Sequence, residues 1–335
     1  MLNLFRPSRI AAIAIILAVP TLIANCSRMA YAVMNVPAHF GSYERHADIR
    51  YGDLPRQSLD VYVPVGAVNR PTVVFWYGGM WTKGSKEQYR FVGAALANSG
   101  YVAILPDYRL FPSVRFPEFV EDGALAVKWA REHASELGGD PRSIFIMGHS
   151  AGAHLASMLA LDERYLKKVG GDPSWIRGWI AISAPYELTM RVPVLHSIFG
   201  ARALAEWQPI QLVSSRTPPA LLVHGLEDNM VHPQDAVDFD AKLRAAGVPV
   251  ECRLYRDVGH VEAIASLSLP LRASADTLAD VRGFIDRTMA AGVGAKPEMG
   301  APCADVRGRK TWQWENPPRE HVPTSTALAG VPQAR

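Results

Sequence analysis

From about Leu59 onward, the chain alternates short apolar, β-rich runs with longer stretches of helical periodicity. This alternation predicts a mostly parallel sheet covered by helices on both faces, an α/β architecture. The carboxyl ends of such strands gather their loops at one edge, where ligands of open α/β sheets bind. The predicted strands are 59–63, 72–76, 102–105, 143–147, 178–182, 220–224 and 250–255, and the predicted helices are 86–98, 119–136, one starting at or just after 150, 234–246 and 271–289.

Two segments interrupt this rhythm and set the domain boundaries. Residues 184–219 lack a clear strand and contain Phe199 and Trp207, so we expect a small partial lid there. From about 291 to 335, Gly, Pro and charged residues dominate, and we expect a poorly ordered tail. The catalytic domain is therefore expected to span residues 40–290.

The first 26 residues have the composition of an export signal. Arg6 and Arg9 precede an apolar run from Ile10 to Ala24, about 15 residues long, which is short for a membrane-spanning helix. Cys26 follows a sequence similar to a bacterial lipoprotein cleavage box, although Asn25 is not the small residue that such a box prefers. A cleaved signal or lipoprotein signal, an uncleaved anchor and a merely apolar helix all remain open. We expect an exported, periplasmic or membrane-associated protein rather than a cytoplasmic one.

Charge and cysteine content exclude several function classes. The formal net charge of +3, without a Lys/Arg tract, does not suggest a nucleic-acid partner. The three cysteines lie far apart, and neither they nor the histidines show metal-ligand spacing, so we expect no metal. In an oxidising compartment Cys252 and Cys303 could pair. Because Cys252 lies in a strand pattern, a buried free thiol is the favoured interpretation.

The segment Gly148-His149-Ser150-Ala151-Gly152 lies directly between a predicted strand and a predicted helix. A nucleophile elbow needs this arrangement, because its turn is too tight for side chains beside the serine. The following helix N-terminus also favours developing negative charge. The alternative is an ordinary glycine-rich turn. In its strand–helix context, the motif predicts that Ser150 is a nucleophile.

A serine hydroxyl needs a base to take its proton, and the base needs a carboxylate to orient it. In this type of fold the chain order is serine, acid, histidine. Asp228 ends a strand-to-loop segment and is the expected acid, with Glu227 as its competitor. His260 follows Gly259 after the last predicted strand and is the expected base, whereas His224 and His232 lie too near the acid to fit as easily.

The loop Trp76 to Trp81 follows an early strand and contains adjacent glycines. Acyl transfer needs backbone donors for the oxyanion that forms on the substrate carbonyl. We expect the N–H groups of Gly79, Met80 and Ala151 to supply them. A plain glycine turn is the alternative.

These motifs together resemble a bacterial α/β-hydrolase of the esterase/lipase group, similar to feruloyl esterases and isoprenylcysteine methylesterases. The resemblance covers about residues 49–288 and rests on Tyr77-Gly78-Gly79-Met80-Trp81, Lys83-Gly84-Ser85-Lys86, Pro106 to Leu110, Gly139-Asp140-Pro141, Gly148 to Gly152, His224-Gly225 with Asp228, and Gly259-His260. It implies the α/β-hydrolase fold. One departure is Tyr77, where the family usually has a histidine that organises the oxyanion loop.

The resemblance also suggests roles for residues near the motifs. It implies that Asp107 and Arg109 brace loops by ion pairing, with Asp122 as a candidate partner. Trp81 and His149 are tentative substrate contacts. Trp81, Trp207 and Phe199 fit an acyl pocket or ordinary core and lid packing equally well.

The expected function is therefore a serine hydrolase that cleaves small-molecule carboxylic esters through an acyl-enzyme, without a cofactor. An amide or formamide hydrolase would use the same machinery, and a non-catalytic scaffold is the third alternative. Sequence spacing does not separate esters from amides. It also gives neither the acyl specificity nor the oligomeric state.

Overall fold

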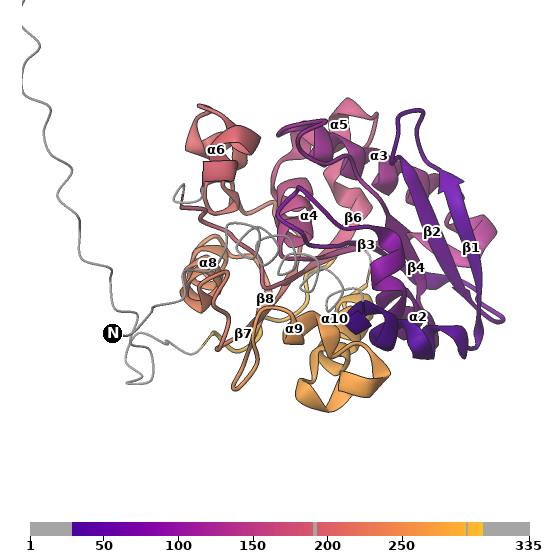
Figure 1. Ribbon diagram of the computed structural model, residues 1–335. Helices are drawn as coiled ribbons and strands as arrows, with labels where there is room; N and C mark the ends of the chain where they lie inside the picture. Colours follow the sequence, from indigo (N-terminus) through magenta and orange to yellow (C-terminus); the bar gives the residue numbers. More distant parts are fainter. Residues whose placement is uncertain (1–28, 190–192, 293, 304–335) are drawn as a thin grey trace, which may run out of the picture.

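The computed structural model describes residues 29–189, 193–292 and 294–303. In this part of the chain, eight strands form one sheet in the order β1-β2-β4-β3-β5-β6-β7-β8, and helices cover both faces (Figure 1). The pairs β1–β2 and β2–β4 are antiparallel, and all other pairs are parallel, so the predicted architecture is confirmed. The strands are β1 (Tyr43–Arg50), β2 (Ser58–Pro64), β3 (Arg70–Trp76), β4 (Val102–Pro106), β5 (Gly139–His149), β6 (Ile176–Ile182), β7 (Ala220–Gly225) and β8 (Val250–Tyr255).

The sequence analysis missed strand β1. Six of its eight residues are exposed and the other two are only partly buried, because β1 is an edge strand outside the helical layers. Its sequence therefore lacks the apolar run or the alternation that indicates a strand. Each of the seven predicted strands is present, with β5 extended at both ends.

Neighbouring residues of β6 show how the sheet is covered on its two faces. Trp179 packs edge-on against Phe239 of α8, with 6.0 Å between the ring centroids. The adjacent Gly178 faces Phe284 of α10, because successive strand residues point to opposite faces. The longer helices are α2 (Arg90–Asn98), α3 (Glu118–His133), α4 (Ala151–Leu161), α8 (Pro233–Ala245) and α10 (Thr277–Ala290), and the short ones are α5 (Glu163–Lys168), α6 (Pro193–Phe199), α7 (Leu204–Trp207) and α9 (Glu262–Ala265).

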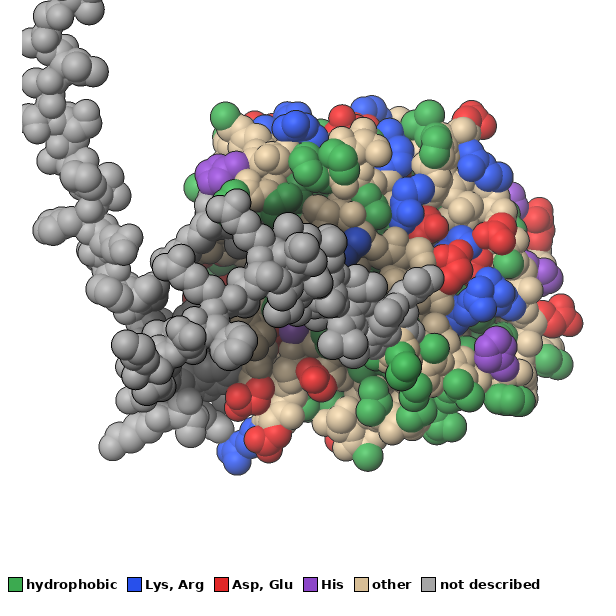
Figure 2. Space-filling model, viewed as in Figure 1, with side chains coloured by type: hydrophobic (Ala, Val, Ile, Leu, Met, Phe, Trp, Pro, Cys, Tyr) green, Lys and Arg blue, Asp and Glu red, His purple; other side chains and the backbone are tan. Residues whose placement is uncertain are grey.

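Residues 29–35 are helical and continue into the 3-10 helix η1 (Val36–His39). This segment is fixed to the domain through Asn35, which donates to the carbonyl of Glu87 at 3.0 Å and accepts from Phe91 N at 2.9 Å. Figure 2 shows hydrophobic side chains gathered at the lower right of this face, where Figure 1 places the indigo N-terminal segment and α2. None of the helices in the described residues has the length and apolar character needed to cross a membrane. The predicted export signal at 1–26 lies outside these residues.

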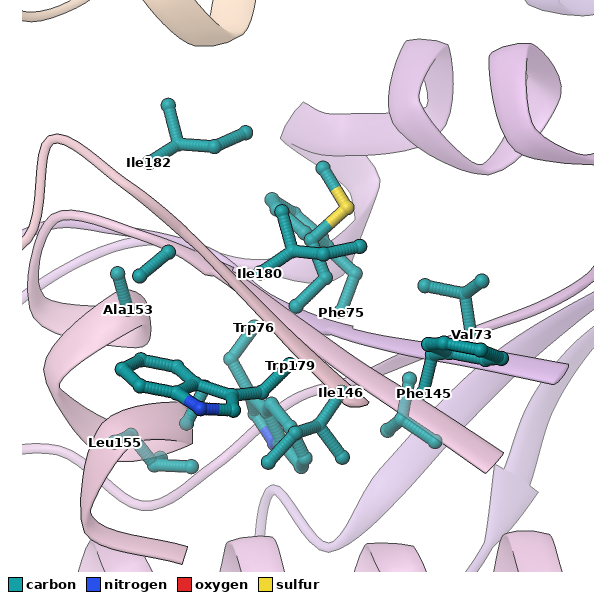
Figure 3. Packing of buried hydrophobic residues seen from close by; sticks show 14 of the residues in the cluster. Val73, Phe75, Trp76, Phe145, Ile146, Ala153, Leu155, Trp179, Ile180 and Ile182 are labelled. Carbon is teal, nitrogen blue, oxygen red and sulfur yellow. The ribbon is translucent and has the colours of Figure 1, made fainter. Parts of the chain in front are cut away.

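Large aromatic and branched side chains fill the space between the sheet and its helices. Trp76, Trp179 and Phe145 are completely buried, and Figure 3 shows them packed with Ile146 and Leu155 around the central strands. Burying a side chain of this kind contributes about 1.5–3 kcal/mol. The centre of the sheet is therefore a rigid base for the loops that follow β3, β5 and β7.

The parallel register brings the strand ends to one edge. Trp76 at the end of β3 pairs with Gly148, and His149 at the end of β5 pairs with Ile182. Gly225 at the end of β7 pairs with Tyr255 at the end of β8. The loops that carry the predicted oxyanion donors, nucleophile, acid and base therefore all start from the same edge of the sheet.

In its described part, the expected lid segment contains no strand. It forms α6, α7 and the 3-10 helix η5 (Pro209–Gln211). Phe199 and Trp207 are buried and stacked, with 4.8 Å between their ring centroids. The backbone N–H of Phe116 also donates to the carbonyl of Ile198, which attaches α6 to the loop before α3.

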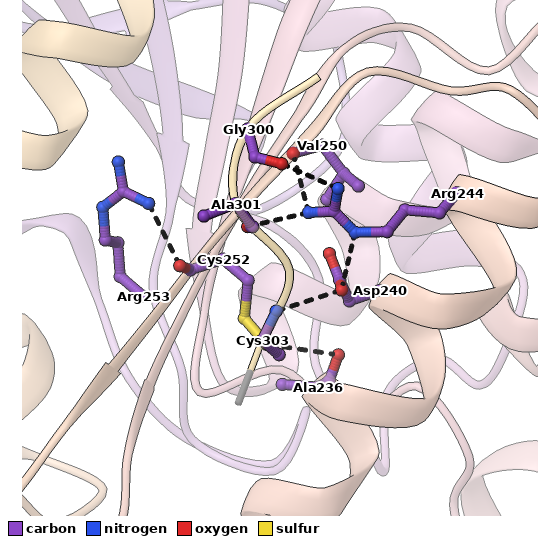
Figure 4. Close-up of a disulfide and its surroundings, with 9 residues drawn as sticks. All are labelled: Ala236, Asp240, Arg244, Val250, Cys252, Arg253, Gly300, Ala301 and Cys303. Carbon is purple, nitrogen blue, oxygen red and sulfur yellow. Dashed lines mark hydrogen bonds and ion pairs between the residues drawn. A yellow bond between two sulfur atoms is a disulfide. The ribbon is translucent and has the colours of Figure 1, made fainter. Parts of the chain in front are cut away.

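The expectation of a buried free thiol at Cys252 was wrong. Cys252 of β8 forms a disulfide with Cys303, across a Cα–Cα distance of 5.1 Å (Figure 4). Arg244 of α8 donates to the carbonyls of Gly300 at 2.7 Å and Ala301 at 2.8 Å. The described part of the expected tail is thus attached to α8 and β8, and residues 304–335 lie outside the described part of the chain.

Candidate active site

Ser150 occupies the turn between β5 and α4 in a strained conformation. Its φ is 54° and its ψ is −121°, a region that non-glycine residues rarely adopt. A Cβ atom at Gly148 would collide with the carbonyl of Gly152, and one at Gly152 would collide with the carbonyls of Trp76 and Tyr77. Glycine is therefore required on both sides of this turn, as the nucleophile-elbow interpretation predicts.

Asp228 and His260 come together from the loops after β7 and β8. His260 Nδ1 lies 2.7 Å from Asp228 Oδ2, and both side chains are buried. Because a carboxylate accepts, Nδ1 carries the proton, which leaves Nε2 as the basic nitrogen of His260. The competing acid Glu227 is exposed and its side chain is not part of this contact. The structure therefore brings the predicted acid and base into contact.

Asp228 accepts four hydrogen bonds within the described residues. Its Oδ1 accepts from the backbone N–H groups of Met230 and Val231, both at 2.9 Å. Its Oδ2 accepts from His260 and also lies 3.1 Å from His224 Nε2. Burial alone would raise the pKa of Asp228, but the hydrogen bonds from His224 and His260 outweigh it and hold the pKa far below its usual range. Asp228 is therefore a permanent anion at neutral pH.

Ser150 lies at the junction of two cavities. One, of about 290 Å³, is also lined by Gly79, His149 and His260. The other, of about 430 Å³, is also lined by Trp81 and Ala151 and has mostly apolar walls. Met80 and Met230 belong to both linings. A substrate that reaches across the serine therefore has room on either side of its reacting carbon.

The predicted oxyanion loop has an unusual backbone. Gly79, Met80 and Trp81 have consecutive positive φ angles of 133°, 54° and 57°. The carbonyl of Gly79 accepts from Thr82 and Lys83 N–H groups, which closes the loop into a tight turn. Ala151 is the first residue of α4, so its N–H has no acceptor within the helix. The three expected donors thus belong to residues that surround Ser150 in the two cavity walls.

Tyr77, which precedes the predicted oxyanion donors in the chain, is hydrogen-bonded through both its hydroxyl and its carbonyl. Its hydroxyl donates to Asp107 Oδ1 at 2.7 Å and accepts from Arg56 Nη2 at 2.6 Å. Its carbonyl accepts from the hydroxyl of Tyr108 at 2.9 Å. Arg109 forms the expected ion pair with Asp122, at 2.8 Å, whereas Asp107 pairs with Arg56, at 3.4 Å. Asp107 also binds the tyrosine that replaces the family's usual histidine.

The tentative substrate contacts differ in their surroundings. His149 lines the smaller cavity but is buried, and its Nε2 donates to the carbonyl of His260 at 3.0 Å. Burial, followed by the nearby His260, lowers the pKa of His149 to about 3, so its ring is neutral. Trp81 lines the larger cavity and packs edge-on against Phe199 at 5.0 Å. Phe199 and Trp207 support Trp81 and are not part of the cavity lining.

Two features escaped the sequence analysis. His224 was set aside because of its closeness to Asp228, yet that spacing allows it to contact the carboxylate from the end of β7. Leu188, Leu195 and Asp235 line the larger cavity from the segment expected to form the lid and from α8. Their positions depend on how these segments fold back over the sheet edge, and no local pattern in the sequence indicates this.

Comparison with known proteins decides the family. The model of the prolyl oligopeptidase family matches residues 120–291, about half of the chain. The chain belongs to the prolyl oligopeptidase family. A second family model, BD-FAE, matches residues 59–171 of this family member, a stretch that includes the oxyanion loop and the elbow.

The relatives of this prolyl oligopeptidase family member are esterases of the α/β-hydrolase group. It is 30% identical over 281 residues to the isoprenylcysteine alpha-carbonyl methylesterase of Arabidopsis thaliana, with 75% of this chain and 65% of the plant protein covered. It is 31% identical to the esterase LipC of Mycobacterium tuberculosis, with 61% of this chain and 56% of that protein covered. The chain thus spans just under two thirds of the plant relative's length. Esterase B of Lactobacillus rhamnosis shares the fold, with a TM-score of 0.70, 21% identity, and 84% and 97% of the two chains covered.

Proposed function

We propose that this protein hydrolyses carboxylic esters through an acyl-enzyme formed on Ser150. The observation that carries the proposal is the 2.7 Å contact between Asp228 and His260 Nδ1, which leaves Nε2 basic in a cavity wall shared with Ser150. The esterase relatives support the same chemistry. Non-catalytic scaffolds do not need a strained serine, an oriented histidine and a buried anion at one sheet edge.

The reaction follows from these roles. Ser150 Oγ attacks the substrate carbonyl carbon while His260 Nε2 takes the hydroxyl proton. The oxyanion accepts hydrogen bonds from the N–H groups of Gly79, Met80 and Ala151, and Asp228 stabilises the imidazolium. Collapse of the intermediate breaks the ester bond, and His260 returns the proton to the leaving alcohol. Water then attacks the acyl-enzyme by the same steps and releases the carboxylic acid.

The two cavities receive different halves of the ester in this scheme. The leaving alcohol takes its proton from His260, so we assign the alcohol to the smaller cavity, which His260 lines. The acyl group then occupies the larger cavity beside Trp81, Leu188 and Leu195. Its apolar walls favour an apolar acyl group, and the carboxylate of Glu187 in the same lining disfavours an anionic one. The methylesterase relative suggests that a small alcohol is sufficient.

The test combines covalent labelling with ester hydrolysis. A fluorophosphonate probe should label the native protein and should not label Ser150→Ala, and hydrolysis of short nitrophenyl esters should fall by at least about 10⁴-fold in this variant. Ser157→Ala is the matched control, because Ser157 is a buried serine of the helix that follows Ser150, and its hydroxyl donates to the carbonyl of Ala153. Folded Ser150→Ala with native activity would refute the proposed mechanism.

Hydrolysis of an amide or peptide bond is the second candidate, and the prolyl oligopeptidase family model favours it. Both reactions use the same nucleophile, so the labelling test does not separate them. Aryl formamides and peptide anilides should be compared with nitrophenyl esters of equal acyl length. A larger kcat/KM for the amide substrates would replace the ester assignment.

The N-terminal sequence supports a proposal about location. We propose that residues 1–26 direct export or attach the protein to a membrane, because Arg6 and Arg9 precede an apolar run. Fractionation of cells that produce the full chain, followed by N-terminal sequencing, should find the protein outside the cytosol. Soluble cytosolic protein with an intact N-terminus would refute it.

A further inference from the structure

An apolar surface, bordered by the exposed His39 and Arg272, surrounds the start of the described chain. Residues 29–40 contain no Lys, Arg, Asp or Glu. Four of their large apolar side chains are exposed, at 69% for Met29, 54% for Val33, 55% for Val36 and 83% for Phe40. Soluble domains rarely expose so many large apolar side chains together, and such patches indicate contact with a membrane or another partner.

The 3-10 helix η6 (Leu269–Ser274) extends this surface. Ser268 Oγ donates to the carbonyl of Met34 at 2.8 Å, which joins the two segments. Phe40 and Leu269 line one small groove, and Leu269 is 62% exposed. The apolar face therefore consists of Met29, Val33, Val36, Phe40, Leu269 and Leu271, and the hydrophobic cluster of Figure 2 lies over the same region.

The sequence before Met29 indicates what covers this face. The apolar run Ile10 to Ala24 ends five residues before Met29, a reach of at most about 17 Å. If the run stays in a bilayer, or if Cys26 carries lipid, the bilayer lies within this reach of the apolar face. We infer that the apolar face rests on the surface of a lipid bilayer and fixes the orientation of the domain on it.

The same helical segment also borders the cavity that contains the active-site serine. Tyr31, on the same helical segment as Met29 and Val33, lines the smaller cavity beside Ser150 and His260. Val261 and Met230 also line that cavity and are 47% and 59% exposed. An apolar ester dissolved in the bilayer would thus have a short path to the serine. The docking itself does not depend on hydrolysis.

The test uses the full chain with p-benzoylphenylalanine, a photoreactive phenylalanine analogue, in place of Phe40. After mixing with phosphatidylcholine vesicles and illumination, mass spectrometry identifies what is crosslinked. The matched control carries the same analogue in place of Leu54, which is 46% exposed. Position 40 precedes β1 and position 54 follows it, and this strand of eight residues spans about 25 Å.

We expect lipid adducts at position 40 at a yield several-fold above those at position 54. Equal lipid adducts at both positions would overturn the inference, because they would indicate contact without orientation. Crosslinks from position 40 to residues 1–28 of the same chain, or to a second copy, would overturn it by identifying a different occupant. Because the readout needs no turnover, its failure is distinct from failure of the proposed ester hydrolysis.

Discussion

His224 Nε2 lies 3.1 Å from Asp228 Oδ2, the same oxygen that accepts from His260. The same nitrogen lies 3.0 Å from the carbonyl of Val231. Both neighbours are acceptors, so Nε2 of His224 carries a proton and donates to them. His224 is thus a positioning residue that supports the same carboxylate oxygen as the proposed base.

Replacing His224 should weaken this support. His224→Ala removes a donor from a buried carboxylate, which should raise the pKa of Asp228 and cost about 1–3 kcal/mol of unfolding free energy. We expect kcat to fall while KM changes little. His224→Gln, which keeps an N–H donor, should recover part of the lost stability and part of the lost kcat, and a native kcat in folded His224→Ala would contradict the assignment.

Tyr77→Phe should show that Tyr77 supports the oxyanion loop and does not bind the substrate. It leaves buried Asp107 without its hydroxyl donor and removes one of the acceptors of Arg56, at an expected cost of about 1–3 kcal/mol in stability. Because the proposed oxyanion donors follow directly in the chain, kcat should fall more than KM rises. Tyr101→Phe is the control, since its hydroxyl binds Asp286 at 3.3 Å, away from the cavities. It should leave kcat at the native value.

Asp235 gives the protein a pH-dependent stability. Burial, then the charges of Glu187, Asp238 and Asp228, raise its pKa from 3.8 to about 7. Between these values the folded protein holds a proton that the unfolded chain releases, so this group makes stability fall as pH rises to about 7. Asp235→Asn lacks this effect. Its Tm relative to the native protein should therefore rise between pH 4 and pH 8.

The control for this measurement is Glu298→Gln, which removes an exposed carboxylate that does not contribute to the raised pKa of Asp235. A Tm difference for Asp235→Asn that stays constant from pH 4 to pH 8 would show that Asp235 does not titrate in this window.

The disulfide should stabilise the fold without entering the chemistry. It closes a loop of 51 residues, for which chain entropy gives about 4 kcal/mol, at the upper end of the usual range. Urea unfolding with and without dithiothreitol should show a loss of about 2–4 kcal/mol on reduction. Cys303→Ser should already be destabilised and insensitive to dithiothreitol. If dithiothreitol destabilised Cys303→Ser as much as it destabilises the native protein, the loss of stability would not come from this disulfide.

The sequence predicted the central sheet well, because buried parallel strands such as β3 and β5 read as continuous apolar runs. It did not predict β1, whose exposed side chains carry no such signal. The contact of Asp228 with His260 followed from chain order and strand ends. The contact of His224 with Asp228 did not. A histidine four residues before an acid contacts it only if the chain between them forms a particular turn, and the sequence does not specify that turn.

The sequence also did not predict which residues far apart in the chain contact one another. Cys252 had a strand-like surrounding that favoured a buried thiol, and its partner lies in a segment whose composition suggested disorder. Similarly, the partner of Asp107 depended on which side chain replaced the family histidine and where its hydroxyl reached. Both outcomes depend on how distant segments meet in space.

Because Ser150 lies between two cavities, different residues determine the preference for the acyl group and the preference for the alcohol. Met80 and Met230 are the shared wall, whereas Leu188 and Leu195 border one chamber and Gln88 and Tyr89 the other. If acid and alcohol occupy separate chambers, each can be enlarged or narrowed without crowding the other. Such an architecture lets selection, or an engineer, exchange one half of the accepted substrate while keeping the other half and the reacting serine unchanged.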